Sequence, residues 1–416
     1  MPDVSTTRLT TAKGESRSTK GTAISGFVKP GFEAVREAFL ENFERRHELG
    51  AACCIYCQGE KVVDLWAGVR NQAAGEPWEE DTMVIVFSAT KGLAGLAMAL
   101  AHSRGLFEYD ERVSKYWPEF AQQGKDKITV RQLLAHQAGL YAFDELGDRS
   151  TLADLDRLAV VLARQKPAHE PGAQQVYHGM TLGFYESELL RRVDPAHRSL
   201  GQYFHEEIAA PLGLDFYIRL PEEIPNSRLA TLRQAKLGFA AMLTMPFPLF
   251  VAGMNPRSAL RRALMGSLFP LDKDRVYTRN FEVPAGGGVG TARAIARAYS
   301  VFATGGKEFG LKEETLRQLM APPVAPLKGF RDGALKVDVR FSLGFTKPNP
   351  RNPFGSPGSF GSPGMGGSFG FADPQAGIGY GYVLNSMGTY LEDPRDLALR
   401  TAMYRSLGKG RDGQIP

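Results

Sequence analysis

Cysteine is scarce in this chain of 416 residues: there are three, all in the segment A-C-C-I-Y-C. Cys53, Cys54 and Cys57 have no second cluster elsewhere with which to complete a zinc site. If the segment is a strand, Cys53 and Cys57 face one side and Cys54 the other. Free cysteines of this kind are usually small buried side chains in a reducing compartment. The sequence therefore predicts a cytoplasmic protein.

Dense blocks of like charge and metal-ligand spacings are also missing. The net charge of +5 is spread along the chain without a Lys/Arg cluster, so we infer no nucleic-acid partner. No H-E-x-x-H or similar spacing occurs. The glycine-rich run Gly286 to Gly290 lacks the lysine that a phosphate loop needs. We expect neither a metal nor another cofactor.

Long apolar segments are nearly absent. Residues 1–26 are rich in Ser and Thr and contain no apolar core, which predicts a disordered tail rather than a signal peptide. The longest charge-free stretch, residues 237–254, could span a bilayer by length, but two prolines interrupt it. We expect no integral membrane segment here, but a buried or pocket-lining one in which Phe247 contacts an acyl group.

The order of local patterns indicates one sheet assembled from both chain ends. Helical spacing over 31–49 is followed by two β-rich runs around Gly59, and the C-terminal part reverses this order. There, two strand patterns flank D-P-Q-A-G, and a helix begins at Asp393. Between the two ends the chain is mostly helical.

We therefore predict an α/β (α+β) sandwich, in which helices flank an antiparallel sheet, plus a helical lobe. The predicted sheet domain comprises residues 27–95 and 281–416. The mainly helical domain comprises residues 96–280 and includes the apolar insert 237–254.

The stretch F-S-A-T-K-G places Ser88 and Lys91 inside an apolar run. On a helix, residues three apart share a face, and a serine at the helix start feels the positive end of the helix dipole. An apolar surround favours the neutral amine, and a neutral amine beside a hydroxyl is a general base beside a nucleophile. The same spacing at Ser406 lies in a polar, glycine-rich end without an apolar helix, and we assign it to chance.

The run V-F-S-A-T-K-G-L-A-G-L-A-M-A-L, with L-L-A-H-Q-A-G-L at 133–140, resembles the serine β-lactamase and penicillin-binding-protein superfamily. It looks most like the class C β-lactamase-like esterases, or family VIII carboxylesterases. The resemblance covers roughly residues 27–405 and implies a β-lactamase-like fold. It also implies that Ser88 is the nucleophile and Lys91 its base.

The second motif of that superfamily is matched by Q-V-Y-H-G-M-T-L-G. The resemblance implies that Tyr177, with Lys91, moves the serine proton. Gly179 replaces the asparagine that helps to hold a lactam amide, which weakens a β-lactamase interpretation. His178 either lines the pocket, as a substrate contact, or caps local backbone, and the resemblance makes His136 structural.

The third motif is matched by G-S-P-G-M-G-G-S at 361–368, which resembles the esterase form H-P-G-x-G-G-S. The resemblance implies an oxyanion hole formed by the backbone N–H groups of Ser88 and Met365, the latter on a strand. Gly364 and Gly366 beside it are predicted substrate contacts. Ser362 replaces the basic residue, so penicillins and peptidyl-D-Ala should bind poorly unless an arginine reaches in from elsewhere.

One competing motif is G-x-S-x-G around Ser368. A nucleophile elbow needs a strand, a sharp turn and then a helix, whereas a strand-like run follows here. No histidine follows His205, so the residue order of an α/β-hydrolase also fails. We predict that Ser368 is structural.

Together these patterns predict a serine carboxylesterase that acts on short- to medium-chain esters through an acyl-enzyme on Ser88. Its partner is a small-molecule ester. A β-lactamase, a D-Ala peptidase or an acyltransferase would use the same nucleophile. A non-catalytic scaffold with this fold would not need Ser88, Lys91 and Tyr177 together. The oligomeric state stays open, a homo-oligomer included.

Overall fold

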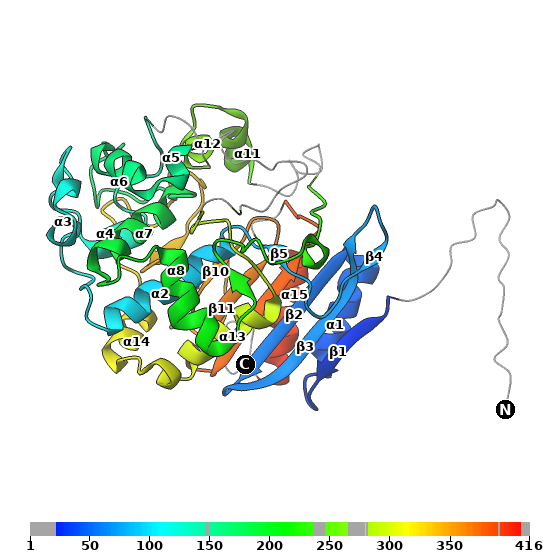
Figure 1. Ribbon diagram of the computed structural model, residues 1–416. Helices are drawn as coiled ribbons and strands as arrows, with labels where there is room; N and C mark the ends of the chain where they lie inside the picture. The colour runs from blue at the N-terminus through cyan, green and yellow to red at the C-terminus, as the bar shows by residue number, and fades with distance from the viewer. Residues whose placement is uncertain are drawn as a thin grey trace, which may run out of the picture.

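The computed structural model describes residues 22–145, 150–235, 246–264, 279, 282–389 and 392–408. Its main feature is a nine-stranded antiparallel sheet with the order β1-β3-β2-β12-β11-β10-β9-β8, in which β4 also pairs with β3 (Figure 1). The strands are β1 Ile24–Val28, β2 Gly50–Cys57, β3 Glu60–Asn71, β4 Glu76–Pro77, β8 Arg340–Ser342, β9 Phe345–Lys347, β10 Phe360–Pro363, β11 Phe369–Asp373 and β12 Ile378–Leu384.

Both predicted hairpins are present, and their pairing joins the two chain ends. β2 pairs with β3 and β11 with β12, while β12 pairs with β2 over its whole length. Cys53 and Cys54 are buried on opposite faces of β2, in separate apolar clusters, as strand alternation predicts. The sheet therefore unites residues that lie more than 300 positions apart.

The predicted tail is corrected at its end. Residues 1–21 lie outside the described part of the chain, but Ile24 to Gly26 belong to β1 and pair with β3. An edge strand gains main-chain hydrogen bonds from its neighbour without a strong apolar pattern, so composition alone did not reveal it.

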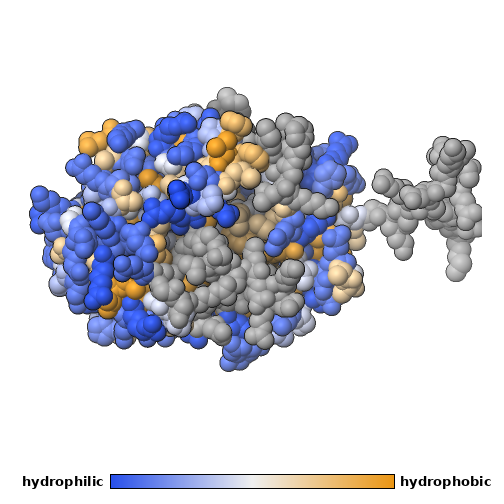
Figure 2. Space-filling model, turned by 90° about the horizontal axis from the view of Figure 1, so that it is seen from above, coloured by the Kyte–Doolittle hydropathy of each residue, from blue (hydrophilic) through white to orange (hydrophobic). Residues whose placement is uncertain are grey.

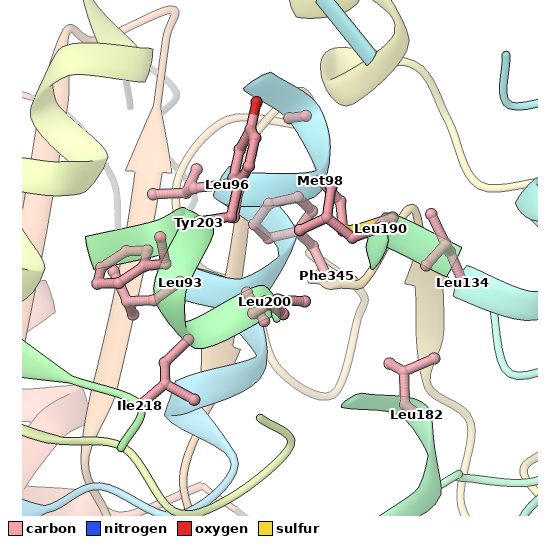
Figure 3. Packing of buried hydrophobic residues seen from close by; sticks show 14 of the residues in the cluster. Leu93, Leu96, Met98, Leu134, Leu182, Leu190, Leu200, Tyr203, Ile218 and Phe345 are labelled. Atoms are coloured by element: carbon pink, nitrogen blue, oxygen red, sulfur yellow. The ribbon is translucent and has the colours of Figure 1, made fainter. Parts of the chain in front are cut away.

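Helices cover both faces of the sheet. On one face, α1 (Glu33–Arg45) and α15 (Pro394–Ser406) pack together over one apolar cluster. On the other, α13 (Ala292–Ala303) lies against β12, β2 and β11, and α2 (Ala89–Ser103) contacts β10 and β11. Every residue of α2 is buried, and its side chains meet the helical part of the molecule, as the packing around Leu93, Leu96 and Met98 shows (Figure 3).

The remaining elements form the helical part, with a small sheet of order β5-β7-β6 beside it. The short strands are β5 Val84–Ile85, β6 Phe216–Tyr217 and β7 Val289–Gly290. The helices are α3 Val113–Tyr116, η1 Pro118–Ala121, α4 Val130–Leu134, α5 Ser150–Ala153, α6 Leu155–Arg164, α7 Thr181–Val193, α8 Leu200–Phe204, η2 His205–Ala209, α9 Ala210–Leu212, η3 Asn226–Arg228, α11 Phe247–Met254, α12 Ala259–Ala263, η5 Lys307–Phe309 and α14 Glu313–Met320.

The apolar insert is less buried than predicted. Residues 237–245 lie outside the described residues. In α11 only Leu249 and Ala252 are buried, whereas Phe247 is 63% and Met254 72% exposed. The upper face of the molecule accordingly shows apolar side chains gathered over α11 (Figure 2). Unlike α2, which other elements enclose on all sides, α11 lies at the surface and buries only one of its faces, although its sequence is apolar all round. Among the described residues, no helix has the length and apolar character needed to cross a membrane.

Candidate active site

Ser88 stands where a short strand turns into the buried helix. β5 ends at Ile85, Phe87 adopts a left-handed conformation (φ 47°), and Ser88 occupies the N-cap position of α2 without a side-chain capping hydrogen bond. Such a conformation is costly for a residue with a bulky side chain and is typical of functional sites. Phe87 itself is buried in a small apolar cluster. Ser88 is only half-buried, so a substrate can reach its hydroxyl.

Lys91 lies one helical turn further and is almost fully buried. Its Nζ donates to the carbonyl oxygens of Gly179 (2.6 Å) and Ala285 (2.7 Å) and lies 3.2 Å from Ser88 Oγ. The two carbonyls each accept an N–H, so the remaining position on Nζ faces the serine. In the neutral amine that position holds the lone pair, which can accept the serine proton.

Tyr177 completes the group around Ser88. Its hydroxyl lies 2.6 Å from Ser88 Oγ, and its ring stacks on Phe341 at 5.7 Å between centroids. Lys91 Nζ lies 4.9 Å from the centre of the same ring. Tyr177 is half-buried and precedes α7 in a segment without regular secondary structure. The three residues singled out from the sequence thus meet at one oxygen atom.

The two histidines near Tyr177, His136 and His178, accept hydrogen bonds from backbone N–H groups. His178 is fully buried, and its Nε2 accepts a hydrogen bond from the Leu140 N–H at 3.0 Å. His136 Nδ1 accepts the His178 N–H at 2.9 Å, and burial lowers the pKa of both imidazoles, that of His178 to about 3. Neutral, enclosed rings of this kind hold the Tyr177 segment in place. The prediction that His178 contacts substrate is therefore corrected in favour of backbone capping.

The third motif begins on β10 and continues through the turn before β11, so Met365 lies in that turn and not on a strand as predicted. Ser362 Oγ donates to the Ser88 carbonyl at 2.6 Å, which ties β10 to the start of α2. A side chain at Gly364 would come within 2.2 Å of the Val86 carbonyl. Within the described part of the chain, the N–H groups of Ser88 and Met365 have no hydrogen-bond acceptor. Two such N–H groups are what an oxyanion hole requires.

Two further sequence assignments can be placed. Gly366 is buried, and its carbonyl accepts a hydrogen bond from the Gly388 N–H at 2.9 Å, so it belongs to the turn and not to a substrate surface. Ser368 is buried and leads directly into β11. The strand-turn-helix order of a nucleophile elbow is not found there.

Glu186 was not anticipated from the sequence. It lies on α7, fully buried, and neither of its carboxyl oxygens has a hydrogen-bond partner among the described residues. Burial raises its pKa from 4.5 to about 8, while the charge of Lys91 opposes this shift. No local sequence signal singles it out, because Ser187, Glu188 and two arginines follow it in the same helix.

Glu186 therefore makes stability depend on pH. Below pH 4.5 the Glu186 carboxyl is neutral in the folded and unfolded states and stability is fully retained. Stability is lost as the pH rises toward about 8, because burial penalises the ionised carboxylate. Glu186→Gln removes the titrating group. We expect its free energy of unfolding, relative to wild type, to improve by about 4 kcal/mol between pH 5 and pH 9 in urea titrations.

The matched control for this prediction is Glu188→Gln on the same helix, because the Glu188 carboxylate is paired with Arg191 and Arg192. Its substitution should be destabilising and should bring no gain at high pH. A difference between Glu186→Gln and wild type that is constant from pH 5 to pH 9 would contradict the assignment.

Comparison with known proteins places this geometry in a family. The family model described as Beta-lactamase matches residues 33–403. The crystal structure of a family VIII carboxylesterase is 36% identical, with a TM-score of 0.80, covering 92% of this chain and 100% of that chain. A penicillin-binding protein homolog from Caulobacter crescentus is 34% identical, with a TM-score of 0.81, covering 92% and 100%. Esterase/beta-lactamase LipL of Mycobacterium tuberculosis is 30% identical over 390 residues, covering 88% of this chain and 84% of LipL. The chain belongs to the beta-lactamase family, and its fold is that of the family's serine hydrolases.

Proposed function

We propose that the protein hydrolyses carboxylic esters of short to medium acyl length through an acyl-enzyme on Ser88. The observation that carries this proposal is the convergence on Ser88 Oγ of the Tyr177 hydroxyl at 2.6 Å and the Lys91 amine at 3.2 Å. A nucleophile with two proton-transfer groups within hydrogen-bond reach is equipped for covalent catalysis.

The reaction would proceed in two halves. Ser88 Oγ attacks the ester carbonyl while its proton passes to Lys91 and Tyr177, and the oxyanion accepts hydrogen bonds from the N–H groups of Ser88 and Met365. The C–O bond to the alcohol then breaks, and the alcohol leaves with that proton. Water attacks the acyl-enzyme by the same route, which releases the acid and restores the serine.

The surroundings of Ser88 favour esters over lactams. A side chain at Gly179 would come within 2.8 Å of the Ala263 carbonyl, so the position lacks room for an amide that could hold a lactam. The Ser362 hydroxyl is already used by the Ser88 carbonyl and is not a cation. A substrate carboxylate therefore has no partner at position 362. The names of two relatives, a family VIII carboxylesterase and an Esterase/beta-lactamase, agree with an esterase.

The β-lactamase alternative is kept because the second of these names includes it. An acyltransferase would form the same acyl-enzyme and pass the acyl group to an alcohol or amine. Product analysis with an added alcohol separates the two, because transfer yields a new ester in place of the free acid.

The proposal is tested with p-nitrophenyl esters from acetate to octanoate beside nitrocefin. We expect ester turnover with kcat/KM at least about 30-fold above that for nitrocefin, because one missing lactam contact and one missing cation each cost about 1–3 kcal/mol of transition-state binding. Faster turnover of nitrocefin than of any ester would assign the protein to the β-lactamases instead.

A further inference from the structure

The turn that carries Met365 is held by two main-chain hydrogen bonds of its own. Gly367 N–H donates to the Gly364 carbonyl at 3.2 Å, and Gly364 N–H donates to the Ser368 carbonyl at 2.7 Å. Gly366 has a φ of 95°, as the third residue of a type II turn requires. The Gly364 carbonyl and the Met365 N–H share one peptide plane and point in opposite directions. The Gly366 carbonyl likewise shares a peptide plane with the Gly367 N–H, which donates to the Gly364 carbonyl. A group that holds the Gly366 carbonyl therefore also fixes the direction of the Met365 N–H.

The turn is anchored from behind by Arg395, the second residue of α15. Its Nη2 donates to the Gly366 carbonyl at 3.2 Å, an oxygen that also accepts the Gly388 N–H at 2.9 Å. Nη2 further donates to Asp393 at 2.7 Å, and Nε donates to Asp393 at 2.8 Å. Its Nη1 donates to Glu48 at 3.1 Å and to the Ser386 carbonyl at 2.8 Å. All five N–H groups of this guanidinium are thus engaged.

The arrangement around Arg395 is rigid and enclosed. Arg395, Asp393 and Glu48 are all less than 9% exposed, and the Tyr382 hydroxyl donates to Glu48 from β12. The network connects the sheet, the start of α15 and the turn of the third motif. A lysine offers three donors from a single point and cannot reach Asp393, Glu48 and Gly366 together.

We propose that Arg395 is a positioning residue: by holding the Gly366 carbonyl, it fixes the direction of the Met365 N–H and so aligns one donor of the oxyanion hole. This inference rests on the proposed function, because it gives that N–H its role in stabilising the oxyanion. Loosening the anchor should weaken binding of a tetrahedral, negatively charged species much more than binding of the planar ester.

The test compares Arg395→Lys with Arg400→Lys. Arg400 is a matched control, since it lies on the same helix, is buried and pairs with Asp396, and its hydrogen bonds do not involve the turn. Asp393→Asn is a milder second variant, because an asparagine can still cap α15 but no longer offers the guanidinium two charged oxygens. The probe is n-butylboronic acid, whose boron takes up Ser88 Oγ and presents a tetrahedral oxygen to the hole. Its affinity is measured by calorimetry, and KM and kcat with p-nitrophenyl butyrate.

For Arg395→Lys we expect boronic acid affinity and kcat to fall about 10- to 100-fold, with KM changed less than about threefold, because the donor is displaced but not removed. Asp393→Asn should show a smaller loss of the same kind, and Arg400→Lys none. Unchanged boronic acid affinity in both Arg395→Lys and Asp393→Asn, an equal loss in Arg400→Lys, or no boronic acid binding by wild type would each overturn the inference. A wild type that binds the boronic acid but cleaves no ester would refute the proposed function alone, because the affinity ratios still test the anchor.

Discussion

Ser88→Ala is expected to lower kcat/KM for p-nitrophenyl butyrate on the order of 10⁵-fold. The methyl group of alanine cannot form the acyl-enzyme, and removal of a serine nucleophile leaves only the rate enhancement due to the oxyanion hole and binding. Steady-state kinetics give the loss. Incubation with a fluorophosphonate followed by peptide mass spectrometry shows whether the label on Ser88 disappears with it.

The control for Ser88→Ala is Ser368→Ala, which removes the hydroxyl of the competing G-x-S-x-G motif. Ser368 is buried like a structural residue and lies in the turn behind the site. The variant should keep turnover within about threefold of wild type, as is usual for a substitution outside the reacting groups. Ester turnover that survives Ser88→Ala and is lost in Ser368→Ala would overturn the proposed mechanism.

Lys91→Met is expected to lower both activity and stability. Methionine matches the length of lysine but cannot accept the serine proton, so kcat/KM should fall about 10³- to 10⁴-fold. The carbonyls of Gly179 and Ala285 lose their buried donor at the same time. Each unsatisfied acceptor costs about 1–3 kcal/mol, so the free energy of unfolding should fall by about 2–6 kcal/mol. Ester kinetics and urea unfolding measure the two effects on one preparation.

Tyr177→Phe separates these two consequences. It removes the hydroxyl that lies 2.6 Å from Ser88 Oγ but keeps the ring that packs on Phe341. Activity should therefore fall without the stability loss expected for Lys91→Met. If Lys91→Met retains ester turnover within tenfold of wild type, Lys91 is not the base, whatever its effect on unfolding.

The sequence predicted the features that depend on residues close together along the chain. Ser88 and Lys91 share a helix face because they are three residues apart, and the apolar run around them required a buried helix. The two hairpins followed from turn residues between β-rich runs. Tyr177 was identified only through a family motif, because nothing in its local pattern distinguishes it from the other tyrosines of the chain.

Contacts between distant segments decided the rest. The carbonyls that hold the Lys91 amine belong to residues 88 and 194 positions away, and Glu48 meets Arg395 across 347 positions. The sequence cannot reveal such pairs. Every residue has a backbone carbonyl, so residue type does not identify the acceptor, and a buried arginine cannot be distinguished from an exposed one by its residue type. The family resemblance placed Met365 on a strand; the three glycines near it permit both strand and turn, and only the pairing of β10 with β11 fixed where the strand ends. The sequence by itself thus set the spacing of the proposed nucleophile and its proposed base and the order of the elements, since these depend on positions along the chain. The tertiary structure alone decided how the proton-transfer groups and the oxyanion donors are held, since that depends on atoms which the fold brings together from its two ends.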